Sequence, residues 1–174
     1  MELYKQASRS AHVAVDQLYT PEYFLQFVKD YIHDGRFYPK FFEYYSDEDF
    51  LEAGRHIDPT IDYTYGCTTM LMLKKRYLLN PNKIIRELPQ HMYMGVAMFL
   101  AIPEPAEKRL AIAKSIYDII ATQKLSLATP CLMNSRRVFH QLSSCFKLSV
   151  DDDLHAIYHN VENVAQISKF GGGV

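Results

Sequence analysis

Residues 89–121 read PQHMYMGVAMFLAIPEPAEKRLAIAKSIYDIIA, and this stretch decides the fold class. Pro89 and Pro105 each precede an apolar pattern, where a proline suits the start of a helix because the first helical N–H needs no partner. Apolar side chains then recur every three or four residues, at Met92, Val96, Phe99 and Leu100 in the first segment and at Leu110, Ala113, Ile116, Tyr117 and Ile120 in the second. This spacing is typical of helices that bury one face, so we predict two consecutive core helices in a mainly α protein.

The preceding residues carry further helix signals. Thr20-Pro21-Glu22 combines a hydroxyl cap, a proline for the first helical position and an acid near the positive end of the helix dipole. We expect this helix to end before Gly35 and a second, short helix to run over 46–54, from the SDED start to Gly54. A third apolar pattern of helical character runs over 61–79, and the Asn-Pro-Asn sequence at 80–82 predicts the turn that follows it.

Composition limits the class of protein. With 174 residues, of which 48% are apolar, the chain can bury a core, and its net charge of −1 argues against a nucleic-acid binder. The basic run Lys74-Lys75-Arg76 is typical of a solvated helix face. The three cysteines form no CxxC pair, which favours a reducing compartment. Without a signal-peptide pattern or a membrane-length apolar run, we expect a soluble, cytoplasmic protein with neither a membrane nor a nucleic acid as partner.

The pattern changes near Leu125. Pro130 and the turn-like Asn134-Ser135 predict extended segments, and 145–150, CFKLSV, alternates apolar and polar residues as a strand does. Three acids at 151–153 suit the start of a last helix. Its predicted inner face is formed by Leu154, Ile157, Tyr158, Val161, Ala165 and Ser168. Three glycines follow at 171–173, and we expect them to form a loop that leads into further structure.

Some of these residues are candidates for a catalytic, ligand-binding or metal-binding role, and each also has a simpler structural explanation. Cys145 is either a reactive thiol or a core thiol, since no base stands near it in the sequence. The glycine run matches neither a Walker loop nor a dinucleotide fingerprint, and it is either a flexible tail or a loop that approaches a ligand closely. His155 and His159 stand four apart, as two metal ligands on a helix would, but HAIYH lacks the glutamate of a zinc-protease motif. We therefore predict no metal site.

Residues 126–174 read SLATPCLMNSRRVFHQLSSCFKLSVDDDLHAIYHNVENVAQISKFGGGV. The ordered set of a Thr-Pro step, an Asn-containing turn, Gln-x-Ser-Ser-Cys, an acidic helix start and Ser-Lys-x-x-Gly-Gly resembles the start of the catalytic barrel of the ribonucleotide reductase large subunit. Upstream, YSDEDF at 45–50, YTYG at 63–66 and KRYLL at 75–79 resemble the helical amino-terminal domain of the same family. The resemblance implies a helical domain over 1–124, followed over 125–174 by the first strand and helix of a ten-stranded α/β barrel.

The resemblance also implies roles for residues. Cys145 matches one of two cysteines that reduce the ribose and become a disulfide during turnover. The residues that match substrate contacts are Thr129, Ser144, Gly172 and Gly173, and those that match the allosteric effector site are Asp152, Asp153 and Leu154. The helix over 152–168 matches the one that pairs across a homodimer.

Cofactors and partners follow from the same resemblance. The complete enzyme would reduce a ribonucleoside diphosphate or triphosphate by thiyl-radical chemistry, with a deoxynucleotide or ATP as effector and an external radical source. We expect no cofactor in this chain. The expected partners are the remaining carboxy-terminal part of the large subunit, a radical-generating small subunit, and thioredoxin or glutaredoxin.

Two departures from the family pattern leave alternatives open. The nucleotide-binding amino-terminal cone and most of the barrel, including the second redox cysteine, have no counterpart in this sequence. The chain is then either one piece of a split large subunit or a degenerate, non-catalytic helical interaction module. A metal-binding helical protein that uses His155 and His159 is the third possibility.

Overall fold

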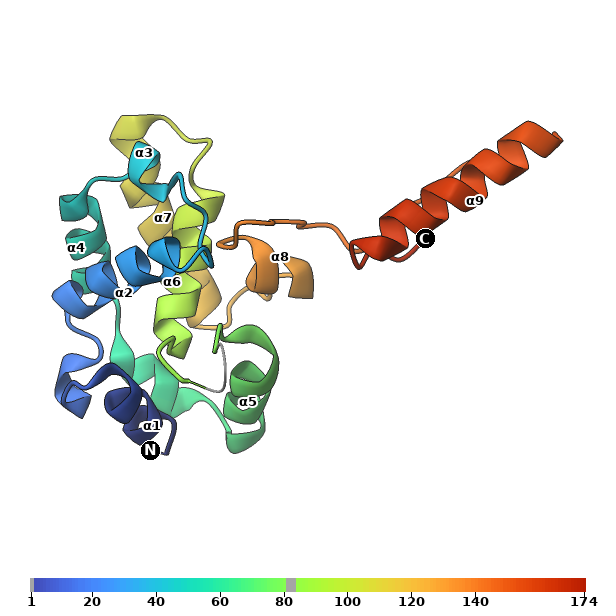
Figure 1. Ribbon diagram of the computed structural model, residues 1–174. Helices are drawn as coiled ribbons and strands as arrows, with labels where there is room; N and C mark the ends of the chain where they lie inside the picture. Colours follow the sequence, from blue (N-terminus) through green and yellow to red (C-terminus); the bar gives the residue numbers. More distant parts are fainter. Residues whose placement is uncertain (1, 81–83) are drawn as a thin grey trace.

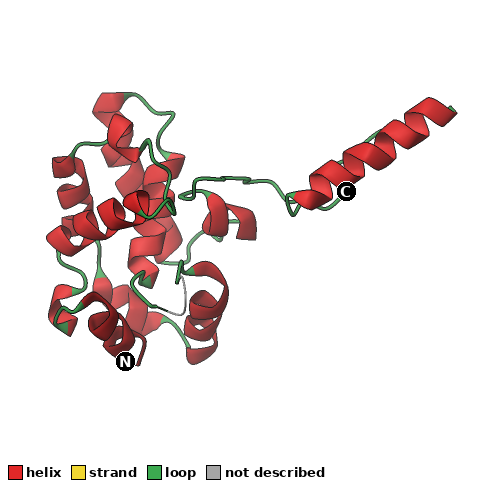
Figure 2. Ribbon diagram, viewed as in Figure 1, coloured by secondary structure: helices red, strands yellow, loops and turns green. Residues whose placement is uncertain are grey.

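The computed structural model describes residues 2–80 and 84–174, which form a cluster of helices from which one long helix projects (Figure 1). The helices of the cluster are α1 (Glu2–Ala11), α2 (Pro21–His33), α3 (Phe41–Tyr44), α4 (Asp47–His56), α5 (Cys67–Met72), α6 (Pro89–Leu100), α7 (Ala106–Ala121) and α8 (Thr129–Asn134), and the projecting helix is α9 (Leu154–Lys169). Two 3-10 turns, η1 (Val15–Gln17) and η2 (Pro59–Thr64), and a π-helical turn, η3 (Leu73–Tyr77), connect some of them. The predicted mainly α class is confirmed, and the described residues contain no strand (Figure 2).

Helix α6 lies at the centre of the cluster. All of its residues from Pro89 to Met98 are buried, and α7 packs along it. In α7, Ala113, Tyr117 and Ile120 are buried, while the other predicted stripe residues pack against the core from its edge. The two helices predicted from residues 89–121 are therefore confirmed.

Helices α2 and α4 pack against each other, and local capping fixes where both begin. The Thr20 hydroxyl accepts a hydrogen bond from the Tyr23 N–H, and Ser46 forms a capping box with Asp49. The predicted end of α4 at Gly54 is wrong, because the helix continues to His56. A Cβ atom on Gly54 would lie 2.7 Å from the Pro21 Cα, so this glycine serves the close approach of α2 and not helix termination.

The pattern over 61–79 is helical but broken. It divides among η2, α5 and η3, because Tyr65 and Gly66 adopt extended backbone between the first two. The Tyr65 hydroxyl donates a 2.6 Å hydrogen bond to the Ala121 carbonyl, which ties this break to the end of α7. Of the predicted turn at 80–82, residues 81 and 82 lie outside the described residues.

An ion pair without solvent exposure joins α8 to the cluster. Arg136, just after α8, directs Nε and Nη2 at the two carboxylate oxygens of Glu87, at 2.7 and 2.8 Å, and both side chains are 0% exposed. Arg136 Nη2 also donates to the Tyr77 carbonyl at 2.9 Å. Residues 129–134, expected to be extended, instead form the short helix α8, with Pro130 in its first turn where a proline is tolerated. The ion pair thus joins the end of α8 to the segment before α6, and the bond to the Tyr77 carbonyl joins it to η3.

The chain after residue 137 is extended, stays against the cluster as far as Leu142, and then leaves it to form α9 (Figure 1). The strand predicted over 145–150 is not confirmed, since the structure has only a single parallel bridge between Cys145 and Gly173 there. The predicted inner face of α9 is wrong for this chain, because none of the residues of that helix is buried. Both results have one physical reason: among the described residues, no second strand pairs along 145–150 and no element buries a face of α9. None of the described helices is long and apolar enough to cross a membrane.

Candidate functional site

Two backbone hydrogen bonds join the segment of Cys145 to the glycine run. The Gly173 N–H donates to the Ser144 carbonyl at 2.7 Å, and the Phe146 N–H donates to the Gly173 carbonyl at 2.8 Å. Cys145 lies between these bonds, with its thiol exposed and its Sγ 3.7 Å from the Ser144 hydroxyl. Three residues predicted from the sequence to act together, Ser144, Cys145 and Gly173, are thus adjacent in the structure.

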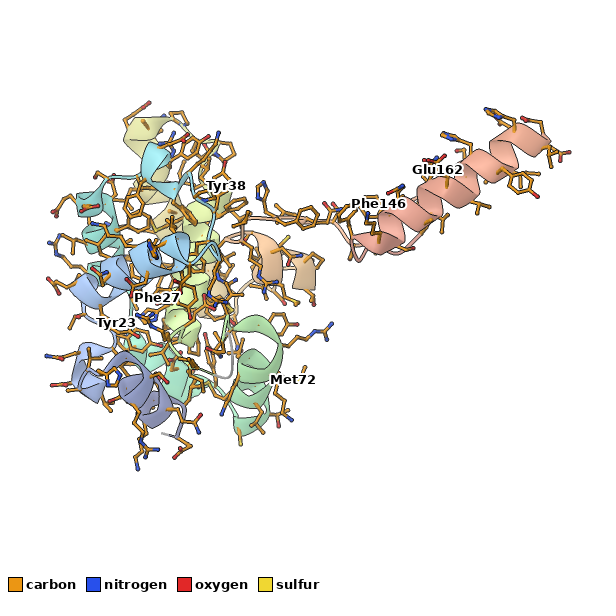
Figure 3. The ribbon with its side chains drawn as sticks, in the orientation of Figure 1. Tyr23, Phe27, Tyr38, Met72, Phe146 and Glu162 are labelled. Carbon is orange, nitrogen blue, oxygen red and sulfur yellow. The ribbon has the colours of Figure 1, made fainter. Side chains whose placement is uncertain are left out.

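Gly172 lies where a larger residue does not fit. A Cβ atom there would be 2.5 Å from the Ile167 Cγ2 and 2.7 Å from the Phe146 Cε2, both closer than carbon atoms approach. Phe146 lies against the inner part of α9, while Glu162 stands further out along that helix (Figure 3). The glycine therefore permits the end of the chain to return beside Cys145.

Substituting Gly172 by alanine is expected to weaken this pairing. The added methyl group must displace Ile167 or Phe146, and overpacking of this kind costs about 1–3 kcal/mol. Hydrogen exchange at the amides of Phe146 and Gly173 measures the effect, which we expect to be about tenfold or more faster. Gly66→Ala is the matched control, since a Cβ atom at Gly66 meets nothing within 4 Å. Equal exchange rates in the two variants would contradict the close packing at Gly172.

A cavity of about 360 Å³ opens beside this pairing. Thr129, at the start of α8, lines it together with Ser144 and Gly171. The Thr129 Oγ1 lies 3.2 Å from the Tyr77 hydroxyl, so η3 positions this side chain. The structure therefore brings Thr129 and Ser144, both predicted as contacts of one ligand, to the same cavity.

Two hydrogen bonds hold the extended segment against α8 at the cavity. The Asn134 amide donates to the Gln141 carbonyl at 2.9 Å, and the Cys131 thiol lies 3.7 Å from the Leu142 carbonyl. Since Gln141 immediately precedes the Leu142-Ser143-Ser144 run, these bonds fix the approach of the chain to Cys145.

The residues predicted for an effector site lie apart from this cavity, at the start of α9. The Asp153 carboxylate accepts a 2.9 Å hydrogen bond from the Ala156 N–H and so caps the helix. Asp152 is exposed, and Leu154 is 71% exposed. These three residues lie close together in the structure only because they are consecutive in the sequence.

His155 and His159 stack with ring centroids 6.3 Å apart on the exposed surface of α9. The His159 Nδ1 is 4.0 Å from a Glu162 carboxylate oxygen. Within the described ranges, no group of three or more His, Cys, Asp or Glu side chains could hold a metal ion. The two histidines thus lack a third ligand among these residues.

Sequence reasoning missed some of the residues around the cavity. Arg76, Gln141 and Ser143 line it as well, and Tyr77 supports Thr129. The basic run that contains Arg76 was interpreted as a solvated helix face, and no local pattern places it beside α8, more than fifty residues later.

Comparison with known proteins agrees with the helical cluster. Residues 63–140 match the family model described as "Ribonucleotide reductase, all-alpha domain". The chain is 36% identical over 132 residues to the ribonucleoside-diphosphate reductase subunit alpha of Treponema pallidum and 41% identical over 130 residues to that of Synechocystis, which is 75% of this chain and 16% of each relative. It is 35% identical over 114 residues to the large subunit of Vaccinia virus, which is 65% of this chain and 14% of that protein. The matched part thus spans about a sixth of the length of these relatives, and the chain belongs to the ribonucleotide reductase large-subunit family.

Proposed function

We propose that this chain supplies the helical amino-terminal part and the start of the catalytic barrel of a ribonucleotide reductase large subunit. In the completed enzyme, a thiyl radical on a cysteine outside this chain abstracts the 3′ hydrogen of a ribonucleoside diphosphate. Cys145 and a second cysteine, also outside this chain, then reduce the 2′ carbon. The two thiols become a disulfide and deliver two electrons and two protons, so that the 2′ hydroxyl leaves as water.

The observation that carries this proposal is the position of Cys145. Its exposed thiol lies beside Ser144, which lines a cavity together with Thr129 and Gly171. The hydroxyl groups of Thr129 and Ser144 can each donate and accept hydrogen bonds, which suits a ligand rich in hydroxyl and phosphate oxygens. The hydrogen bonds of Ser144 and Phe146 to Gly173 restrain the backbone at Cys145, so its exposed thiol can be held close to such a ligand.

The test combines this chain with a polypeptide that supplies the rest of the barrel, a radical-generating small subunit, and a thioredoxin or glutaredoxin as reductant. Deoxynucleotide formation is expected from the mixture and is expected to fall to the blank in Cys145→Ser. Cys67→Ser is the matched control, because Cys67 is also an exposed thiol but lies at the start of α5. Failure of the mixture to reduce nucleotides with both pieces folded, or equal activity of the two variants, would rule the proposal out and leave a non-catalytic interaction module.

We further expect α9 to pair with its copy in a second chain, as the family resemblance implies. The support for this expectation is the exposure of its apolar side chains: Leu154 is 71%, Tyr158 68% and Val161 59% exposed. Such a face gains free energy when a partner covers it. Deoxynucleotide or ATP effectors would then bind beside this interface, near Asp152, Asp153 and Leu154.

Val161→Glu is expected to shift the chain from dimer to monomer, because a carboxylate in the middle of an apolar helix interface must lose its water. Light scattering coupled to size-exclusion chromatography measures the change. The control is Glu162→Gln at the neighbouring exposed position, whose dimer fraction is expected to stay within about twofold of wild type. A dimer that Val161→Glu leaves intact would place the interface elsewhere.

A further inference from the structure

Another cavity, of about 490 Å³, lies between α1, η1 and η2, at the edge of the cluster away from α9 (Figure 1). Its lining residues are Tyr4, Val15, Asp16, Tyr19, Pro59 and Tyr63. Three of them are tyrosines and one is an acid, and no Lys, Arg or His is among the lining residues that the structure describes. Aromatic rings beside a carboxylate are complementary to an organic cation, because the face of a ring carries partial negative charge.

Tyr4 and Tyr19 form two adjoining walls of this cavity. Their ring centroids are 6.2 Å apart and their planes meet at 62°, so the rings form a corner and do not stack. Both hydroxyl groups donate hydrogen bonds to the Asp62 carboxylate, at 2.5 Å from Tyr19, and Asp62 is itself buried. These bonds fix the orientation of the rings. A phenol that donates to a carboxylate also has a more electron-rich ring, which attracts a cation more strongly.

The other two groups of the site, Tyr63 and Asp16, remain accessible to a ligand. Tyr63 is 78% exposed, and Asp16 is exposed as well. Among the described residues no cation forms an ion pair with Asp16. Its carboxylate can therefore accept hydrogen bonds from a cation that lies on the rings. A guanidinium group meets both requirements, because it is planar, stacks on aromatic rings and carries five N–H donors.

We infer that this cavity binds the guanidinium group of an arginine side chain on a partner polypeptide. Val15 and Pro59 supply apolar surface for the methylene groups of such a side chain. A cation–π contact at an exposed site strengthens binding only about two- to fivefold, so a free cation gains little, whereas an arginine on a protein surface adds to a larger interface. The inference does not rest on the proposed function, because none of the residues assigned to nucleotide reduction lines this cavity.

The first experiment titrates the full chain with N-acetylarginine amide at constant ionic strength and follows the NMR signals of the Tyr63 ring and the Val15 methyl groups. Both are expected to shift and to saturate. N-acetylcitrulline amide, which has nearly the same shape without the charge, should bind at least about fivefold more weakly. Equal affinity of the two probes, or no shift with the arginine probe, would overturn the inference. Tighter binding of tetramethylammonium than of the arginine probe would also overturn it, in favour of a site for quaternary ammonium groups.

The second experiment tests the residues. Tyr63→Leu is expected to weaken binding of N-acetylarginine amide by about three- to fivefold, and Tyr63→Phe, which keeps the ring face, should stay within about twofold of wild type. Tyr158→Leu is the matched control, because Tyr158 is also a highly exposed tyrosine, at 68%, but lies on α9. Asp16→Asn should cost about threefold at low salt and less at high salt, since salt screens an exposed charge. Equal affinity of Tyr63→Leu and Tyr158→Leu would contradict the assignment.

Discussion

Arg136→Met is expected to lower the free energy of unfolding by about 3–5 kcal/mol, because it leaves the Glu87 carboxylate buried without its counter-charge. In the native chain both side chains are fully buried and meet through two hydrogen bonds. The substitution also removes the donor to the Tyr77 carbonyl. After it, Glu87 keeps the Leu79 N–H as a hydrogen-bond donor, which cannot replace a cation. Urea unfolding followed by circular dichroism measures the change.

Two further variants separate the ion pair from general damage. Arg137→Met alters the adjacent residue, whose pKa is lowered by burial and by the charge of Arg136, so its charge is disfavoured where it lies. We expect this control to cost less than about 1 kcal/mol. The double variant Glu87→Leu with Arg136→Met should cost less than Arg136→Met alone, since no unpaired charge then remains. A loss in Arg136→Met no larger than that in Arg137→Met would contradict the account.

Acidification from pH 8 to pH 5 is expected to cost about 2 kcal/mol of stability through His91 alone. Burial lowers the pKa of His91 from 6.5 to about 3, and its ring packs among Tyr19, Tyr23, Phe24 and Phe27. In the unfolded chain the imidazole takes up a proton near pH 6.5, whereas in the folded chain it stays neutral until about pH 3. The unfolded state thus binds more protons between these values, so stability is full above pH 6.5 and is lost as the pH falls.

A second buried group acts in the opposite direction. Burial raises the pKa of Asp62, although Tyr19 and Gln90 donate hydrogen bonds to its carboxylate. The folded state therefore holds a proton on Asp62 more readily than the unfolded state, and this contribution favours folding as the pH falls. Comparison of wild type with His91→Phe removes the Asp62 contribution, which both share. Wild type should lose stability relative to His91→Phe as the pH falls from 7 to 5, and a constant difference would show that His91 does not remain neutral.

The helix starts at α2, α4, α6 and α7 could be predicted because their signals are local. A cap or a proline acts within one turn, so Thr20 and Pro89 reveal their roles without knowledge of the fold. The end of α4 was mispredicted because the role of Gly54 depends on Pro21, which lies far from it in the sequence. The fold of α8 and the salt bridge that holds it depend in the same way on Glu87, which is 49 residues from Arg136.

Prediction of the candidate site was limited in the same way, because its contacts join residues that are distant in the sequence. The pairing of Cys145 with Gly173 joins residues 28 positions apart, and nothing in the alternation of 145–150 predicts it. Only the family resemblance predicted one site for Thr129, Ser144 and Cys145, since their spacing carries no such signal. Arg76 was missed because the local sequence around a basic residue is the same whether its side chain lines a cavity or faces solvent.

If Cys145 supplies reducing equivalents to the nucleotide, as proposed, one turnover leaves it in a disulfide, and mapping of disulfides after that turnover is the most direct test. The reconstituted enzyme would convert one equivalent of nucleotide without external reductant, and its thiols would then be alkylated and identified by mass spectrometry. We predict that Cys145 is found in a disulfide with a cysteine of the remaining barrel, while Cys67 is alkylated. Product formation with Cys145 fully alkylated would contradict the claim.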